Sequence, residues 1–286
     1  ADSGCILSVN KNHFNNLDGA SYYGGSNGNT DFRLIKGNGI VISNSNGKFY
    51  YNSFDSPLSS GITASKSDLT ATGNNLNINF GISFVESSAK RTLIQSNSIN
   101  YINGGIFGYE VESPRQLEIT ANALYGEDTN NQFPGTYVSS NTGIEIHNTK
   151  QSGGGIITGH TNFSIDKNSY GIKLFNYGDM EISNSNSTGK SGILLSASPG
   201  NFLIGNSVLT TSNLGGIIHH GIINSWSKNN VFCCNATLRS SYGAYFTGDA
   251  DETHLLGTDF HQNPIASLYV DGYCSEQRHY ANFWPG

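Results

Sequence analysis

Charged side chains are scarce in this sequence. Asp, Glu, Lys and Arg together make up 13% of the 286 residues, and the formal net charge is -6. About 25% charged residues is usual for a soluble domain. A protein that binds nucleic acid needs clustered Lys and Arg against the phosphates. We therefore expect no nucleic-acid partner.

Long apolar runs are also missing. No stretch of the sequence approaches the roughly 18 apolar residues of a membrane-spanning helix. The first five residues, Ala1 to Cys5, lack the basic and apolar pattern of a signal peptide. We therefore expect no membrane insertion, and no signal peptide is visible in this chain.

Cysteine is rare, and its spacing builds no framework. The four cysteines are Cys5, Cys233, Cys234 and Cys274. Adjacent residues of a strand point to opposite faces, so Cys233 and Cys234 are not expected to meet. We predict four reduced thiols that mostly fill the core, and neither a metal site nor another cofactor.

What the sequence contains instead favours strands and turns. It has 35 Gly, 15 Phe and 15 Tyr, but 6 Pro and a single Met. Gly, Asn and Ser disfavour helix interiors, whereas Ile, Val, Tyr, Phe and Thr favour strands. Hydrophobic residues reach 36%, which is too much apolar surface for a disordered chain. The composition therefore predicts an all-β fold.

A short motif, glycine followed by alternating apolar residues, recurs in the second half of the chain about every 21 to 28 residues, a period typical of solenoids. The copies are GIEIH at Gly143, GIKLF at Gly171, GILLS at Gly192, GIIHH at Gly216, GAYFT at Gly243 and SLYVD at Ser267. A second alternating stretch follows each copy, as in NFSID from Asn162 and DMEIS from Asp179. Two strands per copy, separated by Gly, Asn and Ser turns, predict a right-handed parallel β-helix of about 8 to 10 coils.

The regular repeat also sets the expected boundaries. We assign residues 1–273 to the β-helix, with residues 1–59 as less regular first coils or a cap. Residues 274–286 break the pattern and are expected to form a C-terminal cap or a link to a missing domain. Some cover is needed, because the open end of a solenoid is a sheet-like surface that would aggregate.

Alternation along each copy assigns its side chains to the inside or the outside. In GIEIH, Ile144 and Ile146 point inward, so Glu145 and His147 point outward; the same rule buries Ile172, Leu174, Ile193 and Leu195. Stacked copies then predict one outward row of Phe107, Glu145, Lys173, Leu194, Ile218, Tyr245 and Tyr269, and a second of Tyr109, His147, Phe175, Ser196, His220, Thr247 and Asp271.

Three carboxylates are the candidate catalytic residues. The second strands place Glu118 and Glu181 outward in one row, with Asp166 beside them. Acids crowded on adjacent coils repel one another, which raises the pKa of at least one. Glu118 and Glu181 are two coils apart, about 9 to 10 Å at the backbone, near the ~6.5 to 9.5 Å window of inverting glycosidases. The alternative is that all three are solvated surface charges.

The first strands carry a candidate substrate-binding set, Tyr109, Glu145, His147, Lys173 and Phe175. Exposed aromatic side chains stack on sugar rings, and His or Lys near an acid suits a lyase or a hydrolase. Higher in the same rows, an exposed apolar stripe favours contact between subunits. Its members are Leu194, Ile218, Tyr245 and Tyr269.

From about Ser60 to Asp271, the G-I-x-I coils and the Asn- and Ser-rich turns resemble the pectate-lyase-like superfamily of right-handed β-helices, and within it the trimeric tailspikes of bacteriophages. The resemblance implies a homotrimer, on a virion or an extracellular surface, that binds and often cleaves a bacterial surface polysaccharide. It also implies carboxylates on the outer sheet face or between subunits.

The catalytic motifs of better-known members are absent. The Trp-x-Asp-His stretch of pectate lyases is missing, and the Asn-Thr-Asp at residues 29–31 stands alone, without the other polygalacturonase motifs. No catalytic residue is therefore carried over by motif, and plant pectin is a poor candidate substrate.

Three functions follow from these patterns. The first is an endo-acting glycoside hydrolase, in which one of Glu118, Asp166 and Glu181 protonates the leaving oxygen and another activates water. The second is a non-catalytic glycan-binding or adhesion module. The third is a polysaccharide lyase with His147 or Lys173 as the base. We favour the hydrolase.

Overall fold

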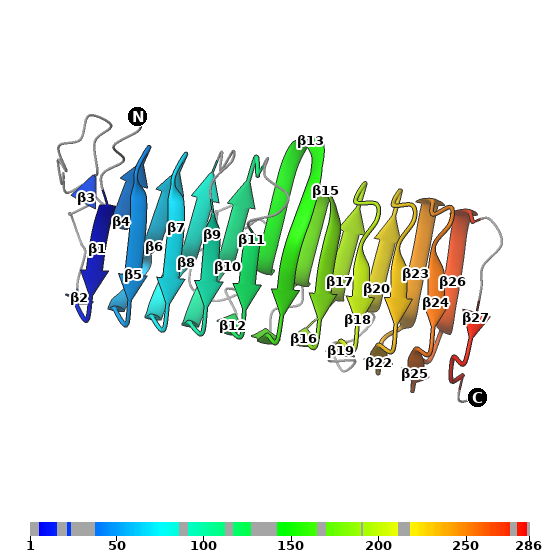
Figure 1. The fold of residues 1–286 in the computed structure, drawn as a ribbon. Helices are drawn as coiled ribbons and strands as arrows, with labels where there is room; N and C mark the ends of the chain where they lie inside the picture. Colours follow the sequence, from blue (N-terminus) through cyan, green and yellow to red (C-terminus); the bar gives the residue numbers. More distant parts are fainter. Residues whose placement is uncertain are drawn as a thin grey trace.

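The strands of this protein stack into one long parallel β-solenoid, with the two ends of the chain at opposite ends of the stack (Figure 1). The computed structural model describes residues 6–15, 22–23, 38–85, 91–111, 117–126, 142–164, 170–189, 191–210, 218–274 and 279–284. Across these ranges every regular element is a β-strand, so no helix is present there that could cross a membrane. The predicted all-β solenoid fold is confirmed.

Each turn contributes one strand segment to each of three parallel sheets. The first sheet contains β3 (Tyr22–Tyr23), β4 (Asn38–Ser43), the second halves of β6 (Ser53–Ser65), β8 (Asn75–Val85) and β10 (Ser98–Tyr109), the first halves of β13 (Thr142–Thr158) and β15 (Tyr170–Ser183), then β17 (Ser191–Ser196), β20 (His220–Ser225), β23 (Tyr242–Asp249) and β26 (Ala266–Tyr273).

The second and third sheets follow in each turn. The second contains β1 (Ile6–Asn10), β5 (Asn46–Tyr50), β7 (Asp68–Thr72), β9 (Thr92–Gln95), β11 (Leu117–Thr120), the second halves of β13 and β15, β18 (Phe202–Ile204), β21 (Val231–Cys233), β24 (His254–Leu256) and β27 (His279–Tyr280). The third contains β2 (His13–Asn15), the first halves of β6, β8 and β10, then β12 (Ala123–Gly126), β14 (Thr161–Ser164), β16 (Asn186–Gly189), β19 (Ser207–Thr210), β22 (Ala236–Leu238) and β25 (Asp259–His261).

The interior of the solenoid is a continuous apolar core. The six residues expected to be buried are all within it: Ile144, Ile146, Ile172, Leu174, Ile193 and Leu195. The strand register agrees, since Glu145 pairs with Phe107 on one side and with Lys173 on the other. The predicted alternation of inward and outward side chains in the first sheet is therefore confirmed for these turns.

One copy of the repeat was assigned to the wrong residues. The sequence has two Gly-Ile-Ile runs five residues apart, and β20 uses the one at Gly221 instead of the one at Gly216. Ile223 therefore pairs with Leu194, in the place expected for Ile218, and Ser225 pairs with Ser196, in the place expected for His220.

The interior explains how this strand tolerates a polar residue. Asn224 points inward in β20, where its Nδ2 donates to the carbonyl of Ser227 at 2.9 Å and its Oδ1 accepts from Nδ2 of Asn230 at 2.9 Å. A buried amide that is fully hydrogen-bonded costs little. Alternation of apolar residues did not predict the run at Gly221, because its inward position after Ile222 is occupied by the polar Asn224. The hydrogen bonds that satisfy this side chain are not visible in the sequence.

The ends of the chain continue the same stack. At the start, Ile40 of β4 pairs with Ile62 of β6, so the run GIVIS at Gly39 is already in register with later turns. After Asp271, β27 pairs with β24, and the ring of Trp284 stacks on Phe260 at a centroid distance of 4.7 Å. Residues 279–284 therefore cover part of the last turn.

The corner between the second and third sheets repeats one pair of residues in every turn. The first of the pair is left-handed, with φ between 49° and 68°, at Lys11, Tyr51, Gly73, Ser96, Ala121, Gly159, Asn184, Gly205, Cys234, Gly257 and Ala281. The second is a polar residue, buried in every turn but the first and the last, at Asn12, Asn52, Asn74, Asn97, Asn122, His160, Ser185, Asn206, Asn235, Thr258 and Asn282. We call this second column the corner ladder.

Hydrogen bonds join the corner ladder from turn to turn. Asn97 is typical: its Oδ1 accepts from the backbone N–H of Asn74 at 2.9 Å, and its Nδ2 donates to the carbonyl of Ala71 at 2.9 Å. Its own N–H donates to Oδ1 of Asn122 at 2.9 Å in the next turn. Because an unpaired buried N–H costs about 1 to 3 kcal/mol, these side chains make the buried corner possible.

His160 replaces asparagine in one turn of the ladder and makes the same two contacts. Its Nδ1 accepts from the backbone N–H of Asn122 at 3.2 Å, and its Nε2 lies 2.8 Å from the carbonyl of Ile119, to which it donates. The imidazole must be neutral to do both. Burial lowers the pKa of His160 from 6.5 to about 4.

This buried imidazole should make the stability of the fold depend on pH. Between pH 6.5 and pH 4 the unfolded chain binds a proton at His160 and the folded chain does not, so the free energy of unfolding is greatest above pH 6.5 and falls as the pH is lowered. The expected loss between pH 7 and pH 5 is about 2 kcal/mol.

The matched variant is His160→Asn, which restores the amide found in most turns and removes the titrating group. Urea unfolding of both proteins at pH 7 and pH 5 measures the effect. The variant should lose about 2 kcal/mol less than the parent over this range. An equal loss in the two proteins would show that His160 does not carry the pH dependence.

Candidate functional site

The outer face of the first sheet carries a row of stacked rings, which we call the outer aromatic row: Phe107, Tyr109, His147 and Phe175. His147 stacks on Phe175 at a centroid distance of 4.5 Å and lies 5.8 Å from Tyr109. Phe107 and Tyr109 are stacked at 6.5 Å within β10. The sequence placed Tyr109, His147 and Phe175 side by side in three successive turns, and the structure has them in that register.

An ion pair lies beside the aromatic row. Nζ of Lys173 is 2.9 Å from Oε1 of Glu145, and the two side chains are only 22% and 13% exposed. Strand pairing in the first sheet sets this contact, because Glu145 and Lys173 are direct partners. The pair presents a fixed donor and a fixed acceptor next to an aromatic surface, the combination by which proteins orient polar ligands.

Glu110 adds a carboxylate that the sequence reasoning missed. It follows Tyr109 at a left-handed corner, and its Oε1 accepts from the backbone N–H of Thr149 at 2.9 Å. The side-chain hydrogen bond with Thr149 is the largest of the causes that lower the pKa of Glu110. An acid directly after an outward aromatic residue was the available signal, but strand alternation assigns no direction to a residue beyond the strand end.

Two of the three predicted catalytic acids share a row on the second sheet. Glu118 in β11 and Glu181 in β15 both pair with Ile156 of β13, so they are two turns apart, about 10 Å at the backbone. An oxygen of Glu118 lies 3.6 Å from the guanidinium of Arg91. Oε1 of Glu181 accepts from the hydroxyl of Ser183 at 3.0 Å.

The strand before Asp166 is not between these acids. β14, which contains the start of NFSID, belongs to the third sheet, where Asn162 pairs with Leu124 and with Ser187. The second half of β13 fills the second sheet of that turn instead, so the assignment of NFSID to the second sheet was wrong. Asp166 itself lies outside the described residues.

Apolar side chains surround the acid pair. Ile156, between the two acids, is 39% exposed, and Phe202, the partner of Glu181 in the next turn, is 50% exposed. The acids therefore stand on an open apolar strip of the second sheet.

The structure divides the predicted site between two sheets. Tyr109, Glu145, His147, Lys173 and Phe175 gather on the first sheet. Glu118 and Glu181 gather on the second. The sequence had placed these two sets on the first and second strands of the turns, as substrate-binding and catalytic residues. Of the strands that bend between the two sheets, β15 carries residues of both sets, with Lys173 and Phe175 on the first sheet and Glu181 on the second.

The predicted apolar stripe is present toward the C-terminal end of the first sheet, but one of its members differs from the prediction. Ile223 occupies the position expected for Ile218, so the stripe consists of Leu194, Ile223, Tyr245 and Tyr269. The rings of Tyr245 and Tyr269 are stacked at 5.4 Å and lie almost parallel.

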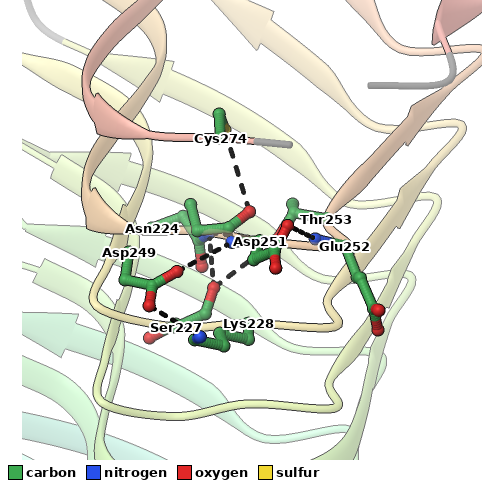
Figure 2. Close-up of polar contacts among 9 residues, drawn as sticks. Asn224, Ser227, Lys228, Asp249, Asp251, Glu252, Thr253 and Cys274 are labelled. Carbon is green, nitrogen blue, oxygen red and sulfur yellow. Dashed lines mark hydrogen bonds and ion pairs between the residues drawn. The ribbon is translucent and has the colours of Figure 1, made fainter. Parts of the chain in front are cut away.

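The acidic corner after β23 is engaged in local contacts (Figure 2). Nζ of Lys228 lies 2.6 Å from Oδ2 of Asp249. The hydrogen bond to Asp249 is the main cause that raises the pKa of Lys228. Oδ1 of Asp251 accepts from the N–H of Glu252 at 3.0 Å. In the part of the chain that the structure describes, no three His, Cys, Asp or Glu side chains are placed to hold a metal ion.

The sequence matches no family model and no curated protein. Solved structures share the fold. A variant of the periplasmic alginate epimerase AlgG has a TM-score of 0.51 and 14% identity, over 87% of this chain and 70% of that chain. The A-module of the mannuronan C-5 epimerase AlgE6 of Azotobacter vinelandii has a TM-score of 0.47 and 11% identity, over 99% and 80%. The Dettilon tailspike protein has a TM-score of 0.40 and 12% identity, over 81% and 62%.

At these identities the likeness establishes the fold alone. The chain has the parallel β-helix fold, which it shares with the distantly similar epimerase AlgG. The comparisons do not single out the tailspikes that the sequence pattern resembles.

Proposed function

We propose that the first sheet binds a polysaccharide along the outer aromatic row. The observation that carries the proposal is the register of Tyr109, His147 and Phe175, which stacks three rings in successive turns on an outer face. Turns of a β-solenoid repeat every ~4.8 Å. Rings stacked at that spacing present a continuous strip of ring edges, an apolar surface along which successive sugar rings can lie.

Polar groups beside the row supply the contacts that a sugar needs. The ion pair of Glu145 and Lys173 is held half-buried, and the carboxylate of Glu110 is fixed by its hydrogen bond to Thr149. Rigid donors and acceptors at the edge of an apolar surface orient a ligand with many hydroxyl groups. The ligand class we propose is a bacterial surface polysaccharide, which this protein would bind from a virion or an extracellular surface, as the tailspike-like sequence pattern implies.

Removal of single rings tests the binding face. His147→Ala and Phe175→Ala should each weaken binding about three- to tenfold, because each removes one stacking contact worth about 0.5 to 1.5 kcal/mol. The control is Tyr51→Ala, which removes an exposed ring outside the row. Isothermal titration against a panel of purified capsular polysaccharides and alginate measures the affinities. Equal loss in the control, or no binding to any member of the panel, would contradict the proposal.

The acid pair favours hydrolysis as a second function of the same protein. Glu118 and Glu181 stand two turns apart on one face, a spacing that leaves room for a water molecule between an acid and a base. We propose that one protonates the leaving oxygen of a glycosidic bond and that the other activates water, with Asp166 as the third candidate. A chain bound to the first sheet would have to pass over the bend of β15 to reach them.

Amide variants test this chemistry. Glu118→Gln, Glu181→Gln and Asp166→Asn should each cut turnover by about 10² to 10⁴-fold if the residue is the acid or the base, and leave binding intact. Glu252→Gln, in the acidic corner, is the control. New reducing ends measure turnover, and NMR should show an inverted product.

Other results assign a different function. New ultraviolet absorbance without water uptake would indicate elimination, with His147 or Lys173 as the base. Retention of the polysaccharide without either product would leave a binding module. Full activity in all three amide variants would exclude the acid pair as the catalytic site.

We also propose that the apolar stripe joins chains into a homotrimer, which the tailspike-like pattern implies. Tyr269→Glu should then release monomers, because a buried charge without a partner destabilises an interface. Tyr125→Glu is a matched control, since Tyr125 in the third sheet and Tyr269 are both 42% exposed. Light scattering at micromolar concentration measures the mass. A monomeric parent protein would contradict the proposal and make the stripe tyrosines candidates for sugar stacking.

A further inference from the structure

Two adjacent cysteines lie side by side on the outside of the solenoid. Cys233 ends β21 and points outward, because Phe232 before it is fully buried. Cys234 follows at the corner, and the two sulfur atoms are 2.9 Å apart. Cys233 is half-buried and Cys234 is exposed. The expectation that these two thiols point to opposite faces and fill the core is therefore wrong.

The left-handed backbone at Cys234 explains why the two cysteine side chains lie side by side. Two extended residues in succession send their side chains to opposite faces, but Cys234 has φ of 58°, so the chain turns at this residue and its side chain leaves on the outer side. Its N–H donates to the carbonyl of Leu256 at 2.8 Å, which holds this corner in the stack. The arrangement is therefore built by the fold.

The corner is open to small reagents. In the turns on either side, the same position is occupied by Gly205 and Gly257, so neither neighbouring corner places a side chain over Cys234. A residue with a β-carbon is disfavoured in this conformation relative to glycine. This turn keeps a cysteine where both of its neighbours have the residue best suited to the backbone.

We propose that Cys233 and Cys234 form a vicinal dithiol site that a low-molecular-weight disulfide oxidises reversibly. The thiolate of Cys234 attacks one sulfur of the reagent and expels one reagent thiol. Cys233 then loses its proton and attacks Cys234 in the mixed disulfide, which releases the second reagent thiol. The two cysteines lose two protons and two electrons, and the reagent disulfide is reduced to two thiols.

Two properties of the site support attack by Cys234 before Cys233 and the later reduction of the disulfide. The hydrogen bond with Cys234, followed by burial, raises the pKa of Cys233, so Cys233 keeps its proton while the exposed Cys234 meets the reagent. Adjacent Cα atoms are about 3.8 Å apart, shorter than the usual 4.4 to 6.8 Å of disulfides. The ring is strained, so an excess of reduced thiol should open it again.

Mass spectrometry can detect the ring directly. Trypsin cuts after Lys228 and Arg239, so peptide 229–239 contains both cysteines and no others. The folded full chain is equilibrated with a mixture of reduced and oxidised glutathione, alkylated, and digested without reductant. The peptide should be free of alkyl groups and lighter than the dithiol form by two hydrogen atoms. Excess reduced glutathione should restore a peptide with two alkylated cysteines.

Two comparisons make the test specific. Cys234→Gly should fold, because glycine occupies this corner in both neighbouring turns, and its Cys233 should either be alkylated or retain one glutathione. The synthetic peptide 229–239 should reach a ratio of ring to dithiol at least about tenfold lower than the folded chain, because it lacks the preorganised corner. Two alkylated cysteines or a retained glutathione in the oxidised parent chain would overturn the proposal, as would an equal ratio in the free peptide.

Discussion

The corner ladder is the interaction on which the rest of this structure depends. A coil that bends between two sheets must take a backbone N–H into the interior at every turn, and water cannot reach it there. Asn97 shows how this N–H is satisfied. Its side chain accepts from the N–H of Asn74 and donates to the carbonyl of Ala71, both in the preceding turn, and its own N–H donates to the side chain of Asn122 in the next turn. The corner of each turn is thereby held directly over the corner of the turn before it.

Because the turns are aligned in this way, residues far apart in the sequence meet on the outer faces of the sheets. Glu145 and Lys173 are 28 residues apart in the chain, yet they meet at 2.9 Å because they are direct partners in neighbouring strands of the first sheet. The same stacking sets the ring of His147 against that of Phe175 and beside that of Tyr109. It also sets Gly205 and Gly257 on either side of Cys234, which leaves that thiol uncovered. The regular stacking of turns, in which the ladder takes part, therefore brings these candidate groups together.

The ladder also accepts substitutions, within limits set by hydrogen bonding. His160 is tolerated because a neutral imidazole has one acceptor and one donor at positions like those of an amide. The substitution links the stability of the solenoid to protonation. At the left-handed position before the ladder, the chain tolerates side chains as different as those of Tyr51 and Cys234 at the cost of some backbone strain. Variation at these corners is thus a means of placing outward groups without disturbing the core.

The sequence by itself determined the all-β solenoid, and in the first sheet it determined which side chains face outward, because period-two alternation is a local property of a strand. The rows through Glu145 and Lys173, and through His147 and Phe175, could be read from it directly. Only the tertiary structure decided which of two similar runs forms a strand, as at Gly216 and Gly221, or that Ile156 separates Glu118 from Glu181. The choice of the run at Gly221 depends on side-chain hydrogen bonds such as those of Asn224 with Ser227 and Asn230, and alternation carries no information about them. The meeting of Cys233 and Cys234 likewise required a left-handed corner, which the sequence marks by glycine in the neighbouring turns but not in this one.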